Sequence, residues 1–337
     1  MTTALVTGAG GFIGHHLVAY LKRRGYWVRG ADRKEPDFDA TPADEFIVAD
    51  LRQPEGAVSA MQGVEEVYAL AADMGGMGFI SQNHAQILRN NALINIHTLE
   101  AARNAGVQRY LYTSSACVYP EYRQTQTDVV PLREEEAYPA QPQDAYGWEK
   151  LLTERLCHHY REEFGLSTRI VRFHNIFGPC GTWEGGREKA PAALCRKIAL
   201  AKLSGNPEIQ IWGDGQQTRS FCYIDDCVEG LYRLAQSEYE EPLNLGQDRL
   251  VSIDQLADMI AEIAHVRIVK MHVPGPQGVR GRNSDNSRLR RVLGWEPQIS
   301  LEDGLTCTYD WIEQQVRDAN RAPTSTELEP EVSSRLR

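Results

Sequence analysis

Short apolar runs alternate with longer amphipathic stretches through the first half of the chain. The apolar runs that favour strands cover residues 4–8, 27–32, 45–50, 65–72, 109–115 and 169–173. Apolar positions that recur every three or four residues predict helices over 12–25, 85–106 and 146–165. Strands that alternate with helices predict an α/β fold built on a doubly wound parallel sheet.

The pattern changes from about residue 173. Residues 174–191, "HNIFGPCGTWEGGREKAP", are rich in glycine and proline and indicate a long functional loop. A helix is predicted at 191–203, with Pro191 as its first residue, and a strand at 209–213. The shorter elements beyond them favour a smaller second α/β lobe.

The chain has 337 residues, which is more than one compact core usually covers. We therefore predict a nucleotide-binding domain over 1–172, completed by part of 210–245. A second lobe, mainly for substrate binding, is predicted over 173–318. The final segment, 319–337, is polar and is predicted to be disordered.

Composition narrows the class of protein. A hydrophobic content of 42% and a charged content of 24% are typical of globular proteins. The net charge of −10 disfavours nucleic acid or an anionic membrane as a partner. No apolar run approaches the roughly 20 residues of a membrane span, and no signal peptide is evident. Seven widely spaced cysteines favour reduced thiols in the cytoplasm, and no zinc-type ligand spacing occurs, so no metal is expected.

The segment "VTGAGGFIG" places Gly8, Gly11 and Gly14 directly after a strand and at the start of a helix. Glycines there let the backbone approach a pyrophosphate, which the helix N-terminus then holds. Asp32 ends the next strand, where an acidic residue accepts the ribose hydroxyls and repels a 2′-phosphate. These features predict a Rossmann-type site for NAD in preference to NADP. Arg33 would instead favour a 2′-phosphate, and Asp32 as a plain turn residue is the alternative.

The segment "DAYGWEK" holds Tyr146 and Lys150, which lie one helical turn apart on the same face. A tyrosine at its ordinary pKa near 10 is a poor base, and a nearby ammonium is expected to lower that pKa. With Ser115 at a strand end, the pair is predicted to take a hydroxyl proton while hydride leaves the adjacent carbon. The predicted cofactor contacts are Gly8, Gly11, Phe12, Ile13, Gly14, Asp32, Asp50, Leu51, Tyr146 and Lys150.

Together these motifs resemble the extended short-chain dehydrogenase/reductase family, specifically its members that modify nucleotide sugars. Residues 212–230, "WGDGQQTRSFCYIDDCVEG", and 278–297, "GVRGRNSDNSRLRRVLGWEP", are similar to that family's substrate-lobe signatures. The resemblance implies that Arg219 and Arg282 clamp the diphosphate of a sugar nucleotide. Without it, each arginine would be read as one half of a surface ion pair.

A closer resemblance covers about residues 3–317. The segments "AADMGGMGFI", "SSACVYPEY" and "GGREKAPAA" are similar to the branch of the family that epimerises GDP-mannose at C3 and C5. The resemblance implies an NAD-dependent isomerase that forms GDP-L-galactose, with GDP-L-gulose as the 5-epimer, and a homodimer joined through two helices. It assigns Cys117 and Lys189 to acid/base chemistry, and Ser115, Tyr146 and Lys150 to the redox step.

The residues assigned to substrate binding are Met74, Gly75, Ser115, Asn175, Glu188, Lys189, Lys197, Arg219 and Arg282. Other interpretations stay open at this stage. Cys117 can also be interpreted as a small packed residue, and Lys189 as a surface lysine. The segment 74–78, "MGGMG", can be interpreted as a flexible turn. Another sugar-nucleotide epimerase, a 4-keto-sugar reductase and a non-catalytic dinucleotide-binding scaffold are the competing functions. The intact serine, tyrosine and lysine set argues against the scaffold.

Overall fold

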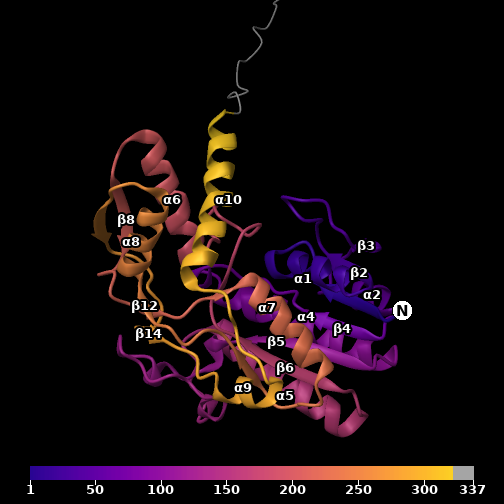
Figure 1. Ribbon diagram of the computed structural model, residues 1–337. Helices are drawn as coiled ribbons and strands as arrows, with labels where there is room; N and C mark the ends of the chain where they lie inside the picture. The colour runs from indigo at the N-terminus through magenta and orange to yellow at the C-terminus, as the bar shows by residue number, and fades with distance from the viewer. Residues whose placement is uncertain (322–337) are drawn as a thin grey trace, which may run out of the picture.

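Seven parallel strands form the central sheet, in the order β11-β6-β5-β4-β1-β2-β3. They are β1 (Thr3–Thr7), β2 (Trp27–Asp32), β3 (Glu45–Val48), β4 (Glu66–Ala69), β5 (Arg109–Ser115), β6 (Thr168–Phe173) and β11 (Leu243–Leu245). This order, read from β3, is that of the Rossmann fold, so the predicted fold class is confirmed. The structure is a computed structural model that describes residues 1–321 (Figure 1).

Helices cover both faces of the sheet because alternate residues of each buried strand point to opposite sides. Ala4 and Val6 pack into one apolar core, whereas Leu5 packs into a second. The first core lies under α1 (Phe12–Arg23) and α7 (Ile224–Gln236). The second lies under α2 (Pro54–Met61), α4 (His84–Asn104) and α5 (Ala145–Phe164).

The remaining elements lie mainly beyond the carboxyl ends of these strands. Figure 1 shows α6, α8 and β8 on the opposite side of the molecule from β2 and β3, with α10 beside α6. The helices are α3 (Met77–Ile80), α6 (Ala190–Ser204), α8 (Ile253–Ala264), α9 (Ser287–Leu293) and α10 (Leu301–Arg321). The short strands are β7 (Ile176–Phe177), β8 (Glu208–Trp212), β9 (Thr218–Arg219), β10 (Cys222–Tyr223), β12 (Val251–Ser252), β13 (Val269–Val273) and β14 (Gly281–Arg282). Short 3₁₀ turns cover η1 (Ala116–Val118), η2 (Glu121–Arg123) and η3 (Glu134–Ala137).

Several predicted element bounds need correction. The run 45–50 yields a strand only as far as Val48. Helix α6 begins at Ala190, so Pro191 is its second residue, and Lys189 is its N-cap. Helix α2 was not predicted, and α10 continues through Arg321, so residues 319–321 of the segment predicted to be disordered are helical. The rest of that segment lies outside the described residues, and the predicted lobe boundaries stay a prediction.

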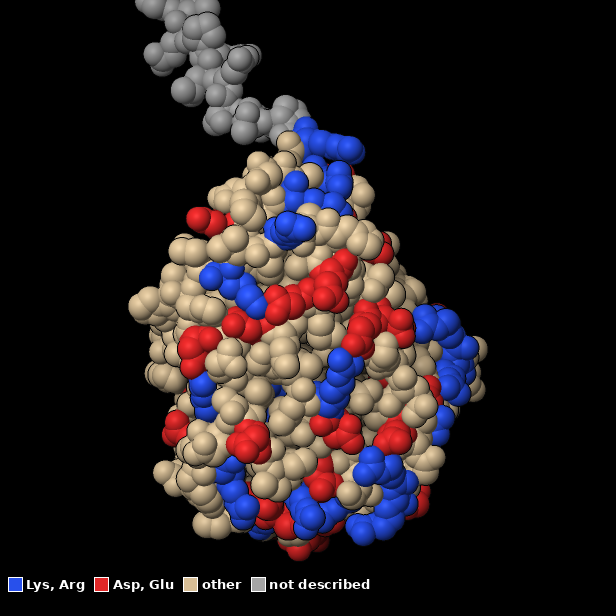
Figure 2. Space-filling view, turned by 60° about the vertical axis from the view of Figure 1, so that its left-hand side comes forward, with Lys and Arg blue, Asp and Glu red and all other residues tan. Residues whose placement is uncertain are grey.

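The surface carries charges of both signs. On the face shown in Figure 2, basic and acidic side chains are interspersed with uncharged ones. No helix within residues 1–321 combines the length and the apolar character that a membrane span requires. The seven cysteines all fall in this described range, and each is a free thiol.

Candidate active site

A cavity of about 390 Å³ opens at the carboxyl ends of the parallel strands. In this fold ligands bind at that edge, where the strand order reverses between β1 and β4. The loop after β1 lines one end of the cavity, and Tyr146, Lys150 and Lys189 line the other. The strand order thus brings residues from distant parts of the chain to one hollow.

The loop between β1 and α1 has the close backbone contacts that only glycine permits. A Cβ atom on Gly14 would lie 2.1 Å from the carbonyl oxygen of Gly8, and Gly8 itself has a φ of +71°. Gly11 is the N-cap of α1, and no side chain of the described residues caps that helix end. Its first-turn N–H groups are therefore free to bind phosphate. These features fit a dinucleotide, and Phe12 and Ile13 line the same cavity.

Asp32 lies at the end of β2 and also lines the cavity. Its carboxylate accepts the backbone N–H groups of Gly10 (3.1 Å) and Arg33 (2.6 Å). Desolvation raises the pKa of Asp32, and these N–H groups oppose that shift. Asp50 lines the cavity as well, but its carboxylate is paired with Arg52 at 2.5 Å. The buried Leu51 completes this end of the lining.

Helix α5 positions Tyr146 and Lys150 on the wall of the cavity. The Nζ of Lys150 donates to the carbonyl oxygen of Thr113 at 2.8 Å and lies 5.5 Å from the Tyr146 ring centroid. The hydroxyl of Tyr146 lies 3.9 Å from the sulfur of Met74. Ser115, at the end of β5, accepts the N–H of Cys117 at 3.2 Å. The predicted serine, tyrosine and lysine set is therefore assembled around one strand end.

One expectation about Tyr146 is wrong for the protein without ligands. Burial raises the pKa of Tyr146 well above its ordinary value, and the charges of Cys117 and Glu149 act in the same direction. A hydrogen bond from Ser115 opposes the shift. Desolvation also lowers the pKa of Lys150, while the carboxylates of Glu149 and Glu154 favour its ammonium form.

Cys117 lies in η1, directly after β5. Its side chain packs against the small apolar cluster that contains Tyr146, and Arg282 donates to its sulfur from Nη1 at 3.3 Å. Arg282 also donates to Gln124 at 2.6 Å and is 9% exposed. The predicted diphosphate arginine thus contacts the predicted acid/base cysteine, which the sequence did not indicate.

Lys189 reaches the cavity from the end of the glycine-rich loop, at the N-cap of α6. Water can reach the side chain through the cavity mouth, yet protein atoms surround it. This desolvation lowers the pKa of Lys189, while the charges of Cys117 and Cys227 favour its ammonium form. Its Nζ has no hydrogen-bond partner within residues 1–321.

Arg219 lies beside Arg282 on the neighbouring strand of a three-stranded sheet. Desolvation and the positive charge of Arg282 lower the pKa of Arg219 to about 9. Two desolvated guanidiniums that repel each other form a site that an anion would stabilise. The guanidinium of Arg219 donates to the backbone carbonyl oxygens of Thr218 and Val279, each at 2.7 Å.

The other predicted substrate residues are spread more widely. Met74 and the buried Gly75 line the cavity. Asn175 has a φ of 47° and donates to the carbonyl oxygen of Ser220 at 2.8 Å. Glu188 pairs with Arg196 at 3.0 Å, and Lys197 donates to the carbonyl oxygen of Gln210 at 2.6 Å. Among the described residues, the lining of this cavity leaves out Ser115, Cys117, Asn175, Glu188, Lys197, Arg219 and Arg282.

Among the residues of the lining that were not predicted, two charged ones form an ion pair. Asp73 and Arg187 both line the cavity and pair at 3.0 Å. They are 114 positions apart, so no local pattern links them. The only sequence signal was that each adjoins a segment assigned to the site, "MGGMG" and "GGREK".

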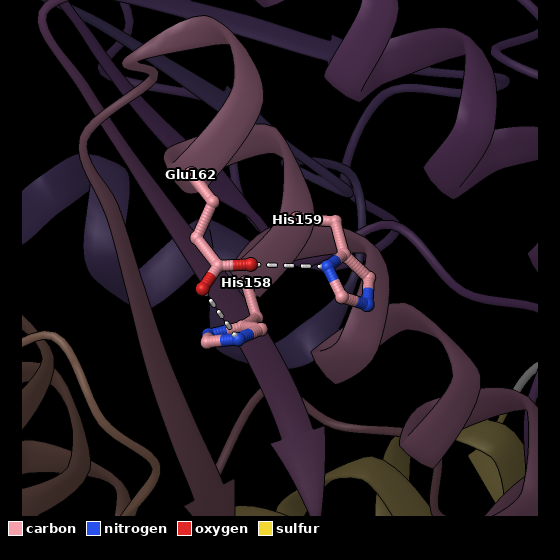
Figure 3. Close-up of side chains that lie close together, drawn as sticks. All are labelled: His158, His159 and Glu162. Atoms are coloured by element: carbon pink, nitrogen blue, oxygen red, sulfur yellow. Dashed lines mark hydrogen bonds and ion pairs between the residues drawn. The ribbon is translucent and has the colours of Figure 1, made fainter.

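A group of possible metal ligands lies elsewhere, near the carboxyl end of α5. Within residues 1–321, His158, His159 and Glu162 come close enough to share an ion, and Figure 3 shows both imidazoles turned toward the carboxylate. Their other ring nitrogens lie beside the guanidiniums of Arg161 (3.1 Å) and Arg155 (3.3 Å). Because each imidazole already bridges an arginine and Glu162, we interpret the group as a surface hydrogen-bond cluster.

Comparison with known proteins agrees with this arrangement. The model of the "NAD dependent epimerase/dehydratase family" matches residues 4–246. The chain is 50% identical to the GDP-mannose 3,5-epimerase of Arabidopsis thaliana, over 92% of this chain and 82% of that protein. Its fold is similar to UDP-glucose 4-epimerase from Thermotoga maritima, with a TM-score of 0.84 and 26% identity over 94% and 100% of the two chains. It is also similar to the UDP-glucuronic acid 4-epimerase of Bacillus cereus, solved with UDP-glucuronic acid and NAD, with a TM-score of 0.79 and 29% identity over 93% and 100%. The chain belongs to the NAD dependent epimerase/dehydratase family.

Proposed function

We propose that this chain epimerises GDP-mannose at C3 and C5, forming GDP-L-galactose with GDP-L-gulose as the 5-epimer. The observation that carries the proposal is that Lys189 lines the same cavity as Tyr146 and Lys150, while Cys117, 72 positions earlier in the chain, packs against the apolar cluster that contains Tyr146. The 50% identity to a plant enzyme of that name supports the choice of substrate.

The glycine loop, Asp32 and Lys150 are the residues that would hold NAD. When bound, NAD supplies a reversible hydride acceptor for C4 of the hexose. The first-turn N–H groups of α1 would carry the pyrophosphate, and Asp32 would accept the ribose hydroxyls. We expect NAD to stay bound through purification and to be regenerated in each turnover.

Tyr146 takes the proton of the C4 hydroxyl and later returns it. Its hydroxyl lies in an apolar wall, where burial disfavours the phenolate. Ser115 donates toward that hydroxyl, and the ammonium of Lys150 is fixed nearby by its bond to Thr113. These two groups supply the stabilisation that a phenolate needs in this wall.

Cys117 and Lys189 exchange protons with the carbons beside C4. With C4 as a ketone, the hydrogens on C3 and C5 become acidic because an enolate spreads the charge. Inversion needs one group to remove a proton from one face and another to add a proton to the opposite face. A thiol and a lysine of lowered pKa suit this task at neutral pH. Arg219 and Arg282 would hold the diphosphate. The sugar would then lie between Cys117 and Lys189.

The test is isotope incorporation. Purified protein is incubated with GDP-mannose in deuterated water, and the sugar is followed by NMR and mass spectrometry. Deuterium at C3 and C5, with inverted configuration at both carbons, is the expected result. Inversion at C4 alone would mark a 4-epimerase. Reduction of a separately supplied 4-keto sugar nucleotide, with consumption of one reduced nicotinamide per product, would mark a reductase. Binding of NAD without turnover of any sugar nucleotide would indicate a non-catalytic dinucleotide-binding scaffold.

For the cofactor, protein stripped of nucleotide is supplied with NAD or NADP. Activity should return with NAD, because the carboxylate of Asp32 opposes a 2′-phosphate. Equal or better activity with NADP would contradict the assignment and point to Arg33. We also expect a reducing compartment such as the cytoplasm, since all seven cysteines are free thiols.

We further infer a homodimer through α4 and α5, which pack against each other. Their outer surface exposes Leu88 and Ile96 from α4, and Trp148 and Leu152 from α5. An apolar surface shared by two helices is typical of a self-association site. Light scattering should give twice the chain mass for the wild type and the mass of one chain for Trp148→Lys with Leu152→Lys. A monomeric wild type would contradict the inference.

A further inference from the structure

The loop that carries Lys189 is held on both sides by ion pairs from the two residues before it. Arg187 pairs with Asp73 at 3.0 Å, and both residues line the cavity. Glu188 pairs with Arg196 of α6, also at 3.0 Å. The same loop contains Gly185 and Gly186, both with positive φ, so its backbone has little stiffness of its own. The position of Lys189 therefore depends on these attachments.

Asp73 is a rigid anchor for this loop. Its side chain is 7% exposed, and its carboxylate accepts Gln86 (3.0 Å) and Asn90 (2.8 Å) of α4 on one oxygen. The other oxygen accepts Arg187. The backbone N–H of Asp73 donates to Asn91 at 2.6 Å, and its carbonyl accepts the same side chain at 3.2 Å. The residue is thus fixed to α4 by backbone and side chain alike.

Arg187 lies over the ring of Phe79, a residue of α3. Its guanidinium carbon is 3.7 Å from the centroid of the Phe79 ring, and Nη1 also donates to the carbonyl oxygen of Met74 at 3.3 Å. Met74 in turn places its sulfur 3.9 Å from the hydroxyl of Tyr146. The contact made by Arg187 therefore joins the side of the cavity that holds Tyr146 to the loop that holds Lys189.

The two loops also touch through their backbones. The N–H of Gly76 donates to the carbonyl oxygen of Arg187 at 2.9 Å. A Cβ on Gly76 would lie 2.4 Å from the carbonyl oxygen of Glu188, so only glycine permits this approach. This explains Gly76 of the segment 74–78, which the sequence left open as a flexible turn.

We propose that Asp73 and Arg187 are positioning residues that fix the loop 185–189 and so place the amine of Lys189 for proton transfer. The proposal rests on the proposed function, because it takes Lys189 as one member of the acid/base pair. Neither residue is assigned a proton in the reaction. The carboxylate of Asp73 is occupied by three donors, and Arg187 cannot lose its proton in a protein.

The test separates inversion from oxidation at C4 in the same holoenzyme. The variants are Arg187→Met, Arg187→Lys and Asp73→Asn. Arg249→Met is the matched control, since it breaks an exposed pair with Glu302 that lies away from the cavity lining. C4 oxidation is read in a single turnover from the absorbance of the reduced cofactor. Inversion is read from deuterium incorporation at C3 and C5 under saturating GDP-mannose, across a range of pH.

We expect Arg187→Met to slow deuterium incorporation about 100-fold, because small misplacement of a reacting group has effects of that size. C4 oxidation should stay within about twofold of the wild type, as in the Arg249→Met control. Asp73→Asn should follow Arg187→Met, and Arg187→Lys should recover part of the rate because it keeps the charge near Asp73. In the partly active variants the pH profile of incorporation should shift, because a displaced amine has a different environment.

Three results would overturn the proposal. A weaker substrate affinity with an unchanged incorporation rate at saturation would make Arg187 a substrate-binding residue. Equal loss of C4 oxidation and deuterium incorporation in all three variants would show that the ion pair supports the whole site and does not specifically position Lys189. No incorporation at C3 and C5 by the wild type would remove the proposed function itself, which is a different failure from a defect confined to the variants.

Discussion

Two lysines reach the same cavity from different kinds of structure. Lys150 stands in the second turn of α5, where it is 2% exposed and donates to the carbonyl oxygen of Thr113 at 2.8 Å. Its Nζ also lies 4.8 Å from the ring centroid of Tyr112. Lys189 instead ends a glycine-rich loop, is open to water in the cavity, and has no hydrogen bond within the described chain.

The two amines also differ in the charged groups that surround them. Desolvation lowers the pKa of both. Around Lys150 the carboxylates of Glu149 and Glu154 favour the ammonium form. Around Lys189, within residues 1–321, no carboxylate does so, and the charges that favour the ammonium form are those of Cys117 and Cys227. A fixed ammonium suits stabilisation of a phenolate, whereas an amine without a partner suits proton transfer.

The most direct test exchanges each lysine for methionine. Lys150→Met should lose C4 oxidation and epimerisation together, by about 10³-fold, because both need the phenolate of Tyr146. Lys189→Met should lose epimerisation to the same extent and keep C4 oxidation. Single-turnover absorbance of the reduced cofactor and NMR of the product distinguish the two. Equal loss of oxidation in both variants would remove the contrast drawn between the lysines.

Cys117 should behave like Lys189 and unlike Lys150. Cys117→Ala is expected to reduce deuterium incorporation at C3 and C5 by at least about 10²-fold while C4 oxidation persists. Cys117→Ser should keep part of the activity, because a hydroxyl can relay a proton although it is a much weaker acid than a thiol. Incorporation into GDP-mannose by each variant is the measurement. If Cys117→Ala labels both carbons at the wild-type rate, the cysteine only packs against Tyr146.

The frame of the site followed from the sequence, because strand ends and glycine turns leave local signals. The run 109–115 coincides with β5, which carries Ser115, and the run 27–32 coincides with β2, which carries Asp32. A buried parallel strand shows as a short, mainly apolar run, which locates it in the sequence. The same signals located α5 to within one residue, and with it Tyr146.

The interactions within the site did not follow from the sequence. The pairing of Asp73 with Arg187 and the contact of Arg282 with Cys117 join residues 114 and 165 positions apart. The direction of the Tyr146 pKa shift was also wrong, because burial outweighs a neighbouring charge and burial depends on tertiary packing. Helix α2 was missed because it has only eight residues, "PEGAVSAM", one of which is a glycine.

Arg282 belongs with Lys189 in this comparison, because it contacts Cys117, the proposed acid/base partner of Lys189. It also lies beside Arg219. Arg282→Ala should weaken GDP-mannose binding about 10- to 100-fold, the usual range for one lost charge-assisted bond. Incorporation at saturation should also fall, because the sulfur loses a donor. Arg280→Ala is the control, since Arg280 pairs with the exposed Asp214 at 2.7 Å. Calorimetry gives the dissociation constants, and equal values for wild type and Arg282→Ala would contradict the clamp.

The smallest expected effect concerns stability. The folded protein lowers the pKa of Lys189 below its unfolded value near 10.4. Between the two pKa values the unfolded chain binds a proton that the folded chain has released, so this residue makes stability rise with pH in that window. Below the folded pKa the desolvated ammonium opposes folding to a constant extent, and above the unfolded pKa it has no effect.

Lys189→Met should therefore be slightly more stable than the wild type at neutral pH, by less than about 1 kcal/mol because water reaches the side chain. The gain should shrink as the pH rises and vanish above about 10.5. Lys202→Met serves as the control, since Lys202 lies on the same helix in an ion pair with Glu313 at 3.1 Å and should gain nothing from the change. Urea unfolding at several pH values measures both. A gain for Lys189→Met that does not change with pH would mean that methionine only packs better. In that case the cavity does not disfavour the ammonium, and the contrast with Lys150 would rest on hydrogen bonding alone.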